Sequence, residues 1–294
     1  MARRTLVPGG TMNSNKMIRI FDGATAIVTG GASGIGRALA EELARRGCEV
    51  VLADLQIELA EEVVSGIRIS GGKATAIEVD VTNFPAVDQL VQETVKRTGR
   101  LDYLFNNAGI SIIGSLHRYT IEDWNQIINT NLCGEVNGVQ AAYKIMAGQG
   151  FGHIVNTSSM TGLVPSPATI AYAATKYALV GLSVSLRSQA EGIGVRVSVL
   201  CPGAVRTPLL TGGKYGKLLD IPKERLLRMW EKFRPMSPDL FAKKALNLVA
   251  KNKAIIIVPW WWKIFWWINR LSPSLGIIVA RKRSEMVRKQ LAME

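Results

Sequence analysis

The sequence ATAIVTGGASGIGRALAEELARRG occupies residues Ala24–Gly47 and combines three local patterns. Ala24–Thr29 is a short apolar run, which predicts a strand, and the last part has the apolar spacing of an amphipathic helix. Between them, Gly30, Gly34 and Gly36 let the backbone turn tightly and approach a ligand closely. A strand, a Gly-rich turn and a helix in this order predict a pyrophosphate site at the helix N-terminus, where free N–H groups and the helix dipole favour an anion.

The alternation of strand and helix patterns continues to residue 258. Apolar runs predict seven strands, at 24–29, 49–53, 74–79, 101–105, 152–157, 195–200 and 254–258. Amphipathic segments between them predict helices, among them residues 84–98, 121–147 and 168–191. This order predicts an α/β fold, a doubly wound domain with a mostly or wholly parallel seven-stranded sheet and helices on both faces. A ligand would then bind beyond the carboxyl ends of the strands.

Asp54 ends the second predicted strand, eighteen residues after Gly36. An acidic residue at this distance from a Gly-rich turn is expected to accept hydrogen bonds from the adenosine ribose of a dinucleotide. Its carboxylate would repel a 2′-phosphate, which favours NAD over NADP. The alternative is an aspartate that only caps the helix beginning at Gln56.

Tyr172 and Lys176 are four residues apart on the predicted helix 168–191, so they share one face. A neighbouring ammonium group favours the phenolate form of tyrosine, which can take a proton from an alcohol. Ser159 follows the fifth predicted strand, where its hydroxyl would be exposed at the edge of the sheet. A tyrosine and a lysine on a solvated helix face are the structural alternative.

Six motifs in this order resemble the short-chain dehydrogenase/reductase family over roughly residues 22–258. They are TGxxxGIG at Thr29–Gly36, NNAG at Asn106–Gly109, Asn131, Ser159, YxxxK at Tyr172–Lys176 and PGxxxT at Pro202–Thr207. The resemblance implies that Tyr172 exchanges the proton of the substrate hydroxyl and that Ser159 hydrogen-bonds its oxygen. It implies that Lys176 holds the nicotinamide ribose, that Asn131 holds a water in a proton relay, and that no metal is needed.

The resemblance also implies the residues that contact the cofactor. Thr207 would bind the carboxamide, Asp80 and Val81 would meet the adenine, and Asn107 would mainly tie the central strands together. The implied cofactor contacts are Gly30, Ser33, Gly34, Ile35, Gly36, Asp54, Asp80, Val81, Asn107, Ala108, Gly109, Tyr172, Lys176, Pro202, Gly203, Val205 and Thr207.

Composition excludes several other classes of protein. A chain of 294 residues with 48% hydrophobic residues can bury a large core. Its net charge of +13 is spread along the sequence and no nucleic-acid motif accompanies it, so no nucleic-acid partner is predicted. Two histidines and three scattered cysteines predict neither a metal site nor a disulfide framework, and favour a reducing compartment such as the cytoplasm. Residues 1–17 are polar and Gly-rich, which predicts a flexible extension.

The predicted domain, 18–258, contains a segment at 208–238 that would form a mobile substrate lid or a simple pair of surface helices. Leu209, Leu210, Leu226 and Trp230 would line its underside.

Residues 259–294 form an aromatic and basic extension in which 260–271 holds five of the seven tryptophans. If this segment is helical, Trp261, Ile264, Phe265 and Ile268 share a stripe. Two interpretations stay open: peripheral contact with a membrane, or packing against the domain or a partner subunit.

These patterns predict an NAD-dependent oxidoreductase that interconverts a secondary alcohol and a ketone on a hydrophobic substrate. The alternatives are a non-catalytic NAD(H)-binding sensor and a membrane-associated scaffold. A homo-oligomer, a dimer or a tetramer, is expected from the resemblance. The substrate, its stereochemistry and the physiological direction are not encoded in any motif.

Overall fold

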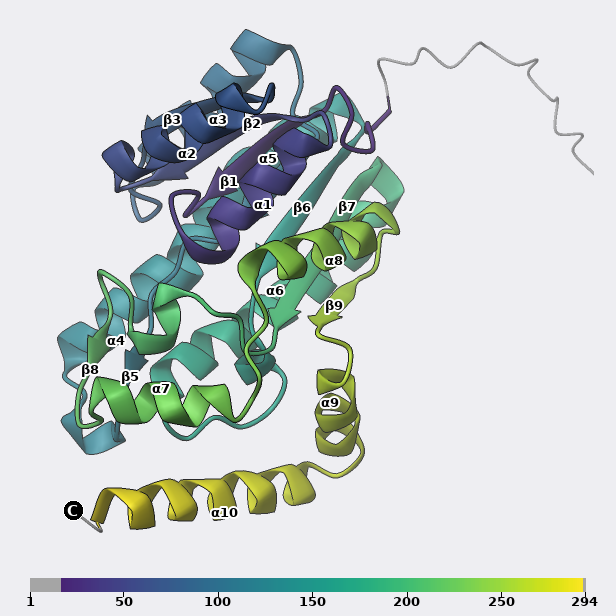
Figure 1. Ribbon diagram of the computed structural model, residues 1–294. Helices are drawn as coiled ribbons and strands as arrows, with labels where there is room; N and C mark the ends of the chain where they lie inside the picture. Colours follow the sequence, from purple (N-terminus) through teal and green to yellow (C-terminus); the bar gives the residue numbers. More distant parts are fainter. Residues whose placement is uncertain (1–16, 293–294) are drawn as a thin grey trace, which may run out of the picture.

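The computed structural model describes residues 17–292, so the predicted extension at 1–17 lies outside it apart from Met17. Seven strands form one sheet in the order β3-β2-β1-β4-β6-β7-β9, and every neighbouring pair is parallel (Figure 1). The strands are β1 (Thr25–Thr29), β2 (Glu49–Asp54), β3 (Lys73–Glu78), β4 (Tyr103–Asn106), β6 (Gly152–Thr157), β7 (Val195–Pro202) and β9 (Ile255–Val258). The predicted doubly wound, wholly parallel sheet is confirmed.

Helices cover both faces of this sheet. The main ones are α1 (Gly34–Arg45), α2 (Ile57–Ile69), α3 (Phe84–Thr98), α5 (Gly134–Gln149), α6 (Ile170–Ala190) and α8 (Pro238–Ala250). Successive strand residues point to opposite faces. Ala26 and Val28 of β1 therefore pack with α1, α2 and α8, whereas Ile27 packs with α3 and α5. Burial on both faces explains why the strands are nearly continuous apolar runs.

The strand order reverses between β1 and β4. From β1 the chain winds outward through β2 and β3, then returns to place β4 on the other side of β1. In open α/β sheets the crevice at such a point, beyond the carboxyl ends of the strands, is where ligands bind. The loops after β1, β4, β6 and β7 all open towards this crevice.

The predicted helix 121–147 is interrupted in the structure. α4 (Ile121–Ile128) is followed by a π-helical turn at Asn129–Cys133, and α5 begins at Gly134. The side chain of Asn131, within this turn, bonds both backbone groups of Ile110. π turns commonly mark functional sites.

The predicted lid segment holds one α-helix rather than two. A short turn at Pro208–Thr211 leads to β8 (Lys217–Leu218) and α7 (Lys223–Glu231). β8 pairs with β5 (Ile112–Ile113) in a second, two-stranded sheet that the sequence analysis did not predict. Strands of two residues are too short to carry a periodic pattern.

Two helices follow the last strand. α9 (Trp262–Leu271) begins two residues later than predicted, and α10 (Pro273–Ala292), drawn in yellow in Figure 1, was not predicted as a separate helix. Trp262 and Trp266 pack against the apolar cluster around Met160 and Leu163. Within residues 17–292, no helix combines the length and the apolar character needed to cross a bilayer.

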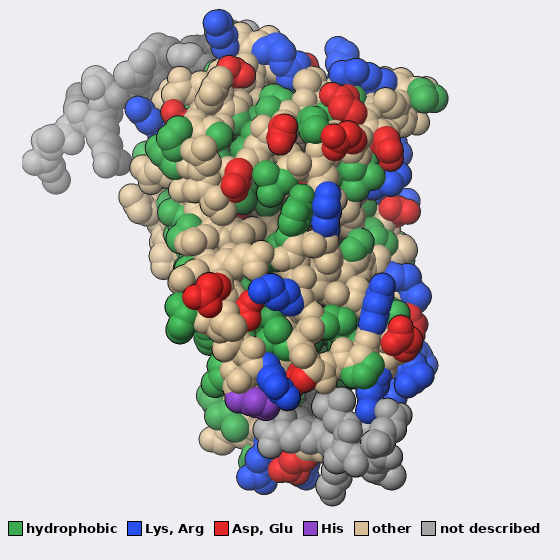
Figure 2. Space-filling view, turned by 90° about the vertical axis from the view of Figure 1, so that its left-hand side faces the viewer, with side chains coloured by type: hydrophobic (Ala, Val, Ile, Leu, Met, Phe, Trp, Pro, Cys, Tyr) green, Lys and Arg blue, Asp and Glu red, His purple; other side chains and the backbone are tan. Residues whose placement is uncertain are grey.

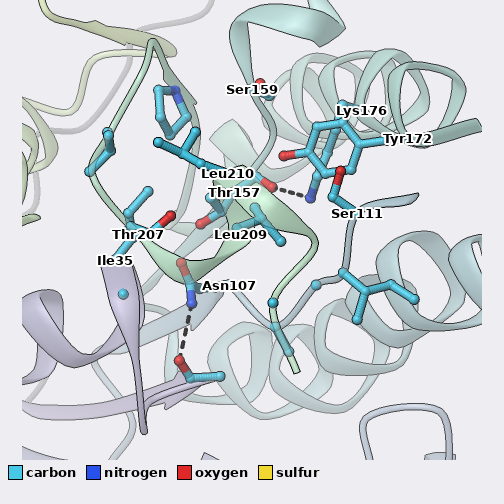
Figure 3. Close-up of a pocket in the computed structure, with 18 of the residues that line it drawn as sticks. Ile35, Asn107, Ser111, Thr157, Ser159, Tyr172, Lys176, Thr207, Leu209 and Leu210 are labelled. Carbon is cyan, nitrogen blue, oxygen red and sulfur yellow. Dashed lines mark hydrogen bonds between the residues drawn. The ribbon is translucent and has the colours of Figure 1, made fainter. Parts of the chain in front are cut away.

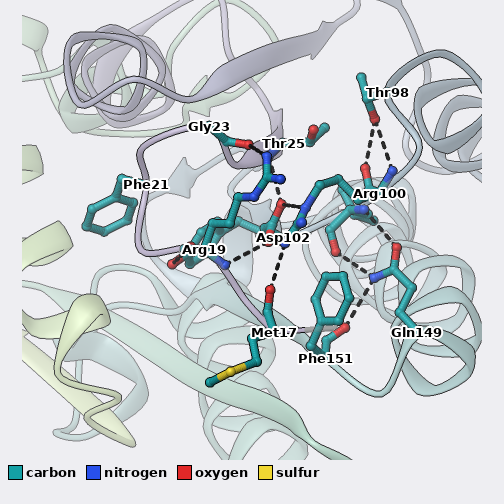
Figure 4. Close-up of polar contacts among 12 residues, drawn as sticks. Met17, Arg19, Phe21, Gly23, Thr25, Thr98, Arg100, Asp102, Gln149 and Phe151 are labelled. Atoms are coloured by element: carbon teal, nitrogen blue, oxygen red, sulfur yellow. Dashed lines mark hydrogen bonds and ion pairs between the residues drawn. The ribbon is translucent and has the colours of Figure 1, made fainter. Parts of the chain in front are cut away.

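Asp102 ties the segment before β1 to the sheet (Figure 4). Its fully buried carboxylate accepts hydrogen bonds from the backbone N–H groups of Arg19 and Thr25, each at 3.0 Å. The guanidinium of Arg100 donates two more, from Nε at 2.7 Å and from Nη2 at 2.5 Å. Nη2 of Arg100 also donates to the carbonyl of Met17. This network fixes the entry of the chain into β1.

Charged side chains are interspersed on the face shown in Figure 2. Lys and Arg lie among Asp and Glu there and do not gather into one basic patch. The positive side chains on this face are therefore dispersed.

Candidate active site

The Gly-rich loop between β1 and α1 forms one end of a cavity of about 300 Å³. Gly30 has φ +64°, and a Cβ atom at this residue would lie 2.8 Å from the Cα atom of Ala108. A Cβ on Gly36 would lie 1.9 Å from the carbonyl oxygen of Gly30. Only glycine fits at either position, so the loop folds tightly against the start of α1. Ser33, Gly34 and Ile35 then present the N-terminus of that helix to the cavity.

The N-terminus of α1 fits a pyrophosphate. The first turn of the helix carries no acidic residue, and its free N–H groups favour an anion. Asp54 stands at the end of β2, where one carboxylate oxygen accepts from Ala32 N at 2.9 Å and the other from Gln56 N at 3.0 Å. The carboxylate thus braces the loop and also lines the cavity, where each oxygen keeps a second lone pair for a ligand hydroxyl.

Asn107 and Thr29 join the ends of β4 and β1. The Thr29 hydroxyl oxygen accepts from the backbone N–H groups of Asn107 and Ala108, and the Asn107 amide donates to the carbonyls of Thr29 and Gly30 (Figure 3). These bonds fix the floor of the cavity beneath the Gly-rich loop.

Tyr172 and Lys176 project from α6 into the other part of the cavity, side by side (Figure 3). The Lys176 ammonium lies 5.5 Å from the centre of the Tyr172 ring. It is 3% exposed and donates to the Thr157 carbonyl at 2.7 Å. Because this bond holds the lysine from the end of β6, the positive charge is fixed beside the phenol rather than left free to move.

The hydroxyl of Ser159 faces the same cavity and accepts a hydrogen bond from the backbone N–H of Thr161 at 3.2 Å. That bond uses a lone pair and leaves the hydroxyl proton available for a substrate oxygen. Gly162 lets this loop pack closely on α6, since a Cβ there would lie 2.4 Å from the Lys176 carbonyl oxygen. The serine and the tyrosine are thus held on two adjoining elements that face one space.

Asn131 is fully buried, and its side-chain amide bonds the backbone of Ile110 on both sides, at 2.8 and 2.9 Å. The water-holding role implied by the resemblance stays a prediction. What the geometry gives directly is a brace for the loop after β4.

Glu135 is a site residue that the sequence analysis missed. It is 2% exposed, and its Oε1 accepts from Lys176 Nζ at 3.3 Å. Its Oε2 has no hydrogen-bond partner among the described residues. Burial raises the pKa of Glu135 to about 8, although the attraction of Lys176 acts against that rise. A pattern that could have indicated it is the spacing of four residues from Asn131 on the same predicted helix.

Most of the predicted site residues line this one cavity. Those that do so are Gly30, Ser33, Gly34, Ile35, Asp54, Asp80, Val81, Asn107, Ala108, Gly109, Ser159, Tyr172, Lys176, Pro202, Gly203, Val205 and Thr207. Gly36 and Asn131 lie behind it and act through packing and hydrogen bonds.

The wall opposite Tyr172 is apolar. Leu209 and Leu210 from the predicted lid segment project there (Figure 3), together with Trp230 and Trp262. Leu226, also predicted to face the site, lines an adjoining cavity instead. Residues 17–292 contain no cluster of three or more His, Cys, Asp or Glu side chains placed to hold a metal ion.

Comparison with known proteins yields a family and several relatives. The family model for short chain dehydrogenases matches residues 24–214. The chain is 37% identical to 2,5-dichloro-2,5-cyclohexadiene-1,4-diol dehydrogenase of Sphingobium indicum over 64% of its length and 75% of the relative. It is 34% identical to a 3-oxoacyl-(acyl-carrier-protein) reductase of Thermotoga maritima, over 64% of its length and 77% of the relative.

A solved structure resembles the fold over nearly the whole chain. A short chain dehydrogenase/reductase from Burkholderia phymatum, in complex with NAD, is 28% identical and has a TM-score of 0.74. The similarity covers 93% of this chain and 97% of that one.

Proposed function

The chain belongs to the short chain dehydrogenase family and has the general oxidoreductase role of that family, and on this premise we propose that it interconverts a secondary alcohol and a ketone with NAD. The observation that carries the proposal is one cavity with two ends. Tyr172, Lys176 and Ser159 face one end, and the Gly-rich loop with Asp54 forms the other. A dinucleotide laid along the crevice would reach from α1 to the tyrosine.

The chain's own residues handle the proton. In the oxidative direction the Tyr172 phenolate accepts the hydroxyl proton of the substrate, and the Ser159 hydroxyl donates a hydrogen bond to the same oxygen. Lys176, held by Thr157, stabilises the phenolate through its fixed charge. A bound nicotinamide would supply the acceptor for the hydride that leaves the carbinol carbon. The alcohol thereby loses two electrons and two hydrogens, and the reductive direction reverses each transfer.

The position of Asp54 supports NAD rather than NADP. A 2′-phosphate on the adenosine ribose would meet a carboxylate that is held rigidly by Ala32 N and Gln56 N. For Asp54→Ala we expect the NAD/NADP ratio of kcat/KM to fall towards one. An unchanged ratio would remove Asp54 from the ribose site.

The test is NADH formation, followed by absorbance, across secondary alcohols graded in size and repeated with NADP. Tyr172→Phe should lower kcat by about 10²-fold or more while NAD binding persists. Tyr177→Phe is the matched control. Tyr177 directly follows Lys176 on the same helix, but its side chain is 43% exposed and does not line the cavity. Equal turnover in both variants would show that the base is misassigned.

The exposed side chains of Trp260 and of α9, which follows it, support a peripheral membrane contact. Trp260 is 67% exposed, Ile264 53% and Trp267 50%, next to Lys263 and Arg270. Apolar bulk beside basic residues suits a headgroup region. Co-sedimentation with anionic liposomes, compared between the wild type and a Trp260→Ser/Trp267→Ser variant, tests the contact. We also expect the family's usual oligomeric state, which analytical ultracentrifugation measures.

A further inference from the structure

A second, larger cavity lies beside the candidate active site. Its volume is about 1080 Å³, against about 300 Å³ for the catalytic cavity. Its walls come from residues 113–117, from the loop before α6, from α7 and from the two C-terminal helices, of which Figure 1 shows α9 beside α7 and α10 below it.

The two cavities share part of their walls. The residues that line both are Ile113, Val164, Pro165, Ser166, Thr169, Trp230 and Trp262. Trp262 is anchored on the domain side by the Met160 cluster, and a Cβ on Gly203 would lie 2.1 Å from its indole nitrogen. The second cavity therefore adjoins the space in front of Tyr172 across these shared walls.

The lining of the second cavity is mostly apolar, with Ser115, His117, Ser166, Thr169 and Asn269 as its polar side chains. In the part of the chain that the structure describes, none of its residues is Asp, Glu, Lys or Arg. Leu226, Met229, Phe265 and Val279 face it from three different helices. Protein interiors are normally packed at crystal-like density, so a space of this volume is not an ordinary packing defect. Its size and its mostly apolar lining are those of a ligand site.

We propose that this second cavity binds the long apolar chain of the substrate, so that the enzyme acts on secondary alcohols or ketones that carry their reactive carbon near one end of an extended alkyl chain. The inference rests on the proposed function and names its substrate class. The reactive carbon would sit at Tyr172 and Ser159, and the chain would pass Trp230 and Trp262 towards α10.

The alkyl chain is the occupant that the geometry favours. A charged extension would find no side chain of opposite charge in this lining, and along Leu226, Met229, Phe265 and Val279 a polar one would be buried without a hydrogen bond, which is unfavourable. A short substrate would leave the larger of the two cavities empty. Each methylene buried there should raise kcat/KM by about fourfold, until the chain reaches the far wall.

Two alanines on opposite walls allow the cavity to be blocked without touching the catalytic residues. Ala280 lines it from α10, and Ala168 lines it from the loop before α6. Ala280→Phe and Ala168→Phe each fill part of the far space. Ile278→Phe is the matched control, because Ile278 is on α10, is 44% exposed and does not line the cavity.

The experiment measures kcat/KM with NAD for alkan-2-ols of increasing length, from butan-2-ol upward, below their aggregation limits. For the wild type and Ile278→Phe we expect a rise of about fourfold per methylene over several methylenes. For Ala280→Phe and Ala168→Phe the rise should stop at a shorter chain, with butan-2-ol unchanged. A wild-type profile that is flat with chain length, or identical profiles for the blocking variants and the control, would overturn the proposal.

A binding measurement separates this proposal from the proposed reaction. An 11,12-dibromododecan-2-one probe should quench tryptophan fluorescence saturably in the wild type, because Trp230 and Trp262 stand in the cavity wall. Quenching should weaken in Ala280→Phe and persist in Ile278→Phe. If no alcohol is oxidised but this pattern holds, only the redox assignment fails. If alcohols are oxidised but quenching is unaffected by Ala280→Phe, only the chain site fails.

Discussion

Replacing Asp102 by Asn should destabilise the protein far more than the same chemical change at an exposed ion pair. Asp102 is fully buried and accepts four hydrogen bonds, two of them from Arg100, whose side chain is 9% exposed. In the Asp102→Asn variant, an NH₂ group replaces one of the two carboxylate oxygens. This group cannot accept the hydrogen bonds that the replaced oxygen accepts, and it would face their donors. Arg100 would keep its charge in a buried place without the opposite charge, which costs about 3–5 kcal/mol.

The matched control is Glu231→Gln. Glu231 pairs with Arg206 at 2.9 Å, but the two side chains are 55% and 62% exposed. Such pairs contribute about 0–1 kcal/mol, so the free energy of unfolding should change by less than about 1 kcal/mol.

The assay is urea unfolding followed by circular dichroism at fixed protein concentration, with the slopes compared so that midpoint shifts report stability. If the Asp102→Asn and Glu231→Gln variants lost similar, small amounts of stability, the argument that burial decides the value of these ion pairs would be refuted.

Three further predictions concern buried groups. The pKa of Glu135 is raised from 4.5 to about 8, so between these pH values the folded protein holds a proton that the unfolded chain has released, and stability falls as pH rises. Glu135→Gln should remove this fall in urea unfolding measured across the same pH range. An unchanged dependence on pH would contradict the prediction. Burial lowers the pKa of His153 to about 3, so stability falls as pH drops below about 6.5. In thermal melts, His153→Gln should make the melting temperature fall less steeply as pH drops through this range. An equally steep fall in the variant would assign the loss of stability to other groups. In α5, Gly138→Ala would place a Cβ atom 2.1 Å from a buried amide oxygen and should lower the free energy of unfolding by about 1–3 kcal/mol. Gly148→Ala on the same helix meets nothing within 4 Å and should raise the free energy of unfolding by up to about 1 kcal/mol. Equal effects of the two variants on the unfolding midpoint would show that the helix moves to accommodate the added Cβ atom.

The sheet could be predicted from the sequence because each strand is buried on both faces. Runs such as Ala24–Thr29 and Val195–Leu200 are apolar at most positions because they pack under helices on two sides, and this leaves a pattern that a single sequence shows. The positions of Gly30, Asp54 and Ser159 followed from the same pattern, since strand ends in a parallel sheet meet at one edge.

Long-range contacts were not predictable in the same way. Glu135 looks like an ordinary charged residue on an amphipathic helix, and only the fold brings Lys176, distant in the chain, to within 3.3 Å of it. The π turn at Asn129–Cys133 contains no residue that breaks a helix, so its cause lies in the tertiary bonds of Asn131 to Ile110. In the tail, helical spacing grouped Trp261 with Ile264, although Trp262 and Trp266 are the tryptophans that pack on the domain.

The close packing of Trp262 against Gly203 affects which C-terminal segments could replace the natural one in a chimeric protein. The family match ends at residue 214, and α7, α9 and α10 all lie beyond it, yet they line one side of the larger cavity. A chimera joined near residue 214 would keep Ser159, Tyr172 and Lys176. It would receive other segments in place of α7, α9 and α10, and therefore a different lining on that side of the second cavity. The candidate catalytic residues and these three helices thus lie in successive stretches of one chain, and exchange of the second stretch would alter the proposed chain site without replacing the first, as long as the residue beside Gly203 still fits.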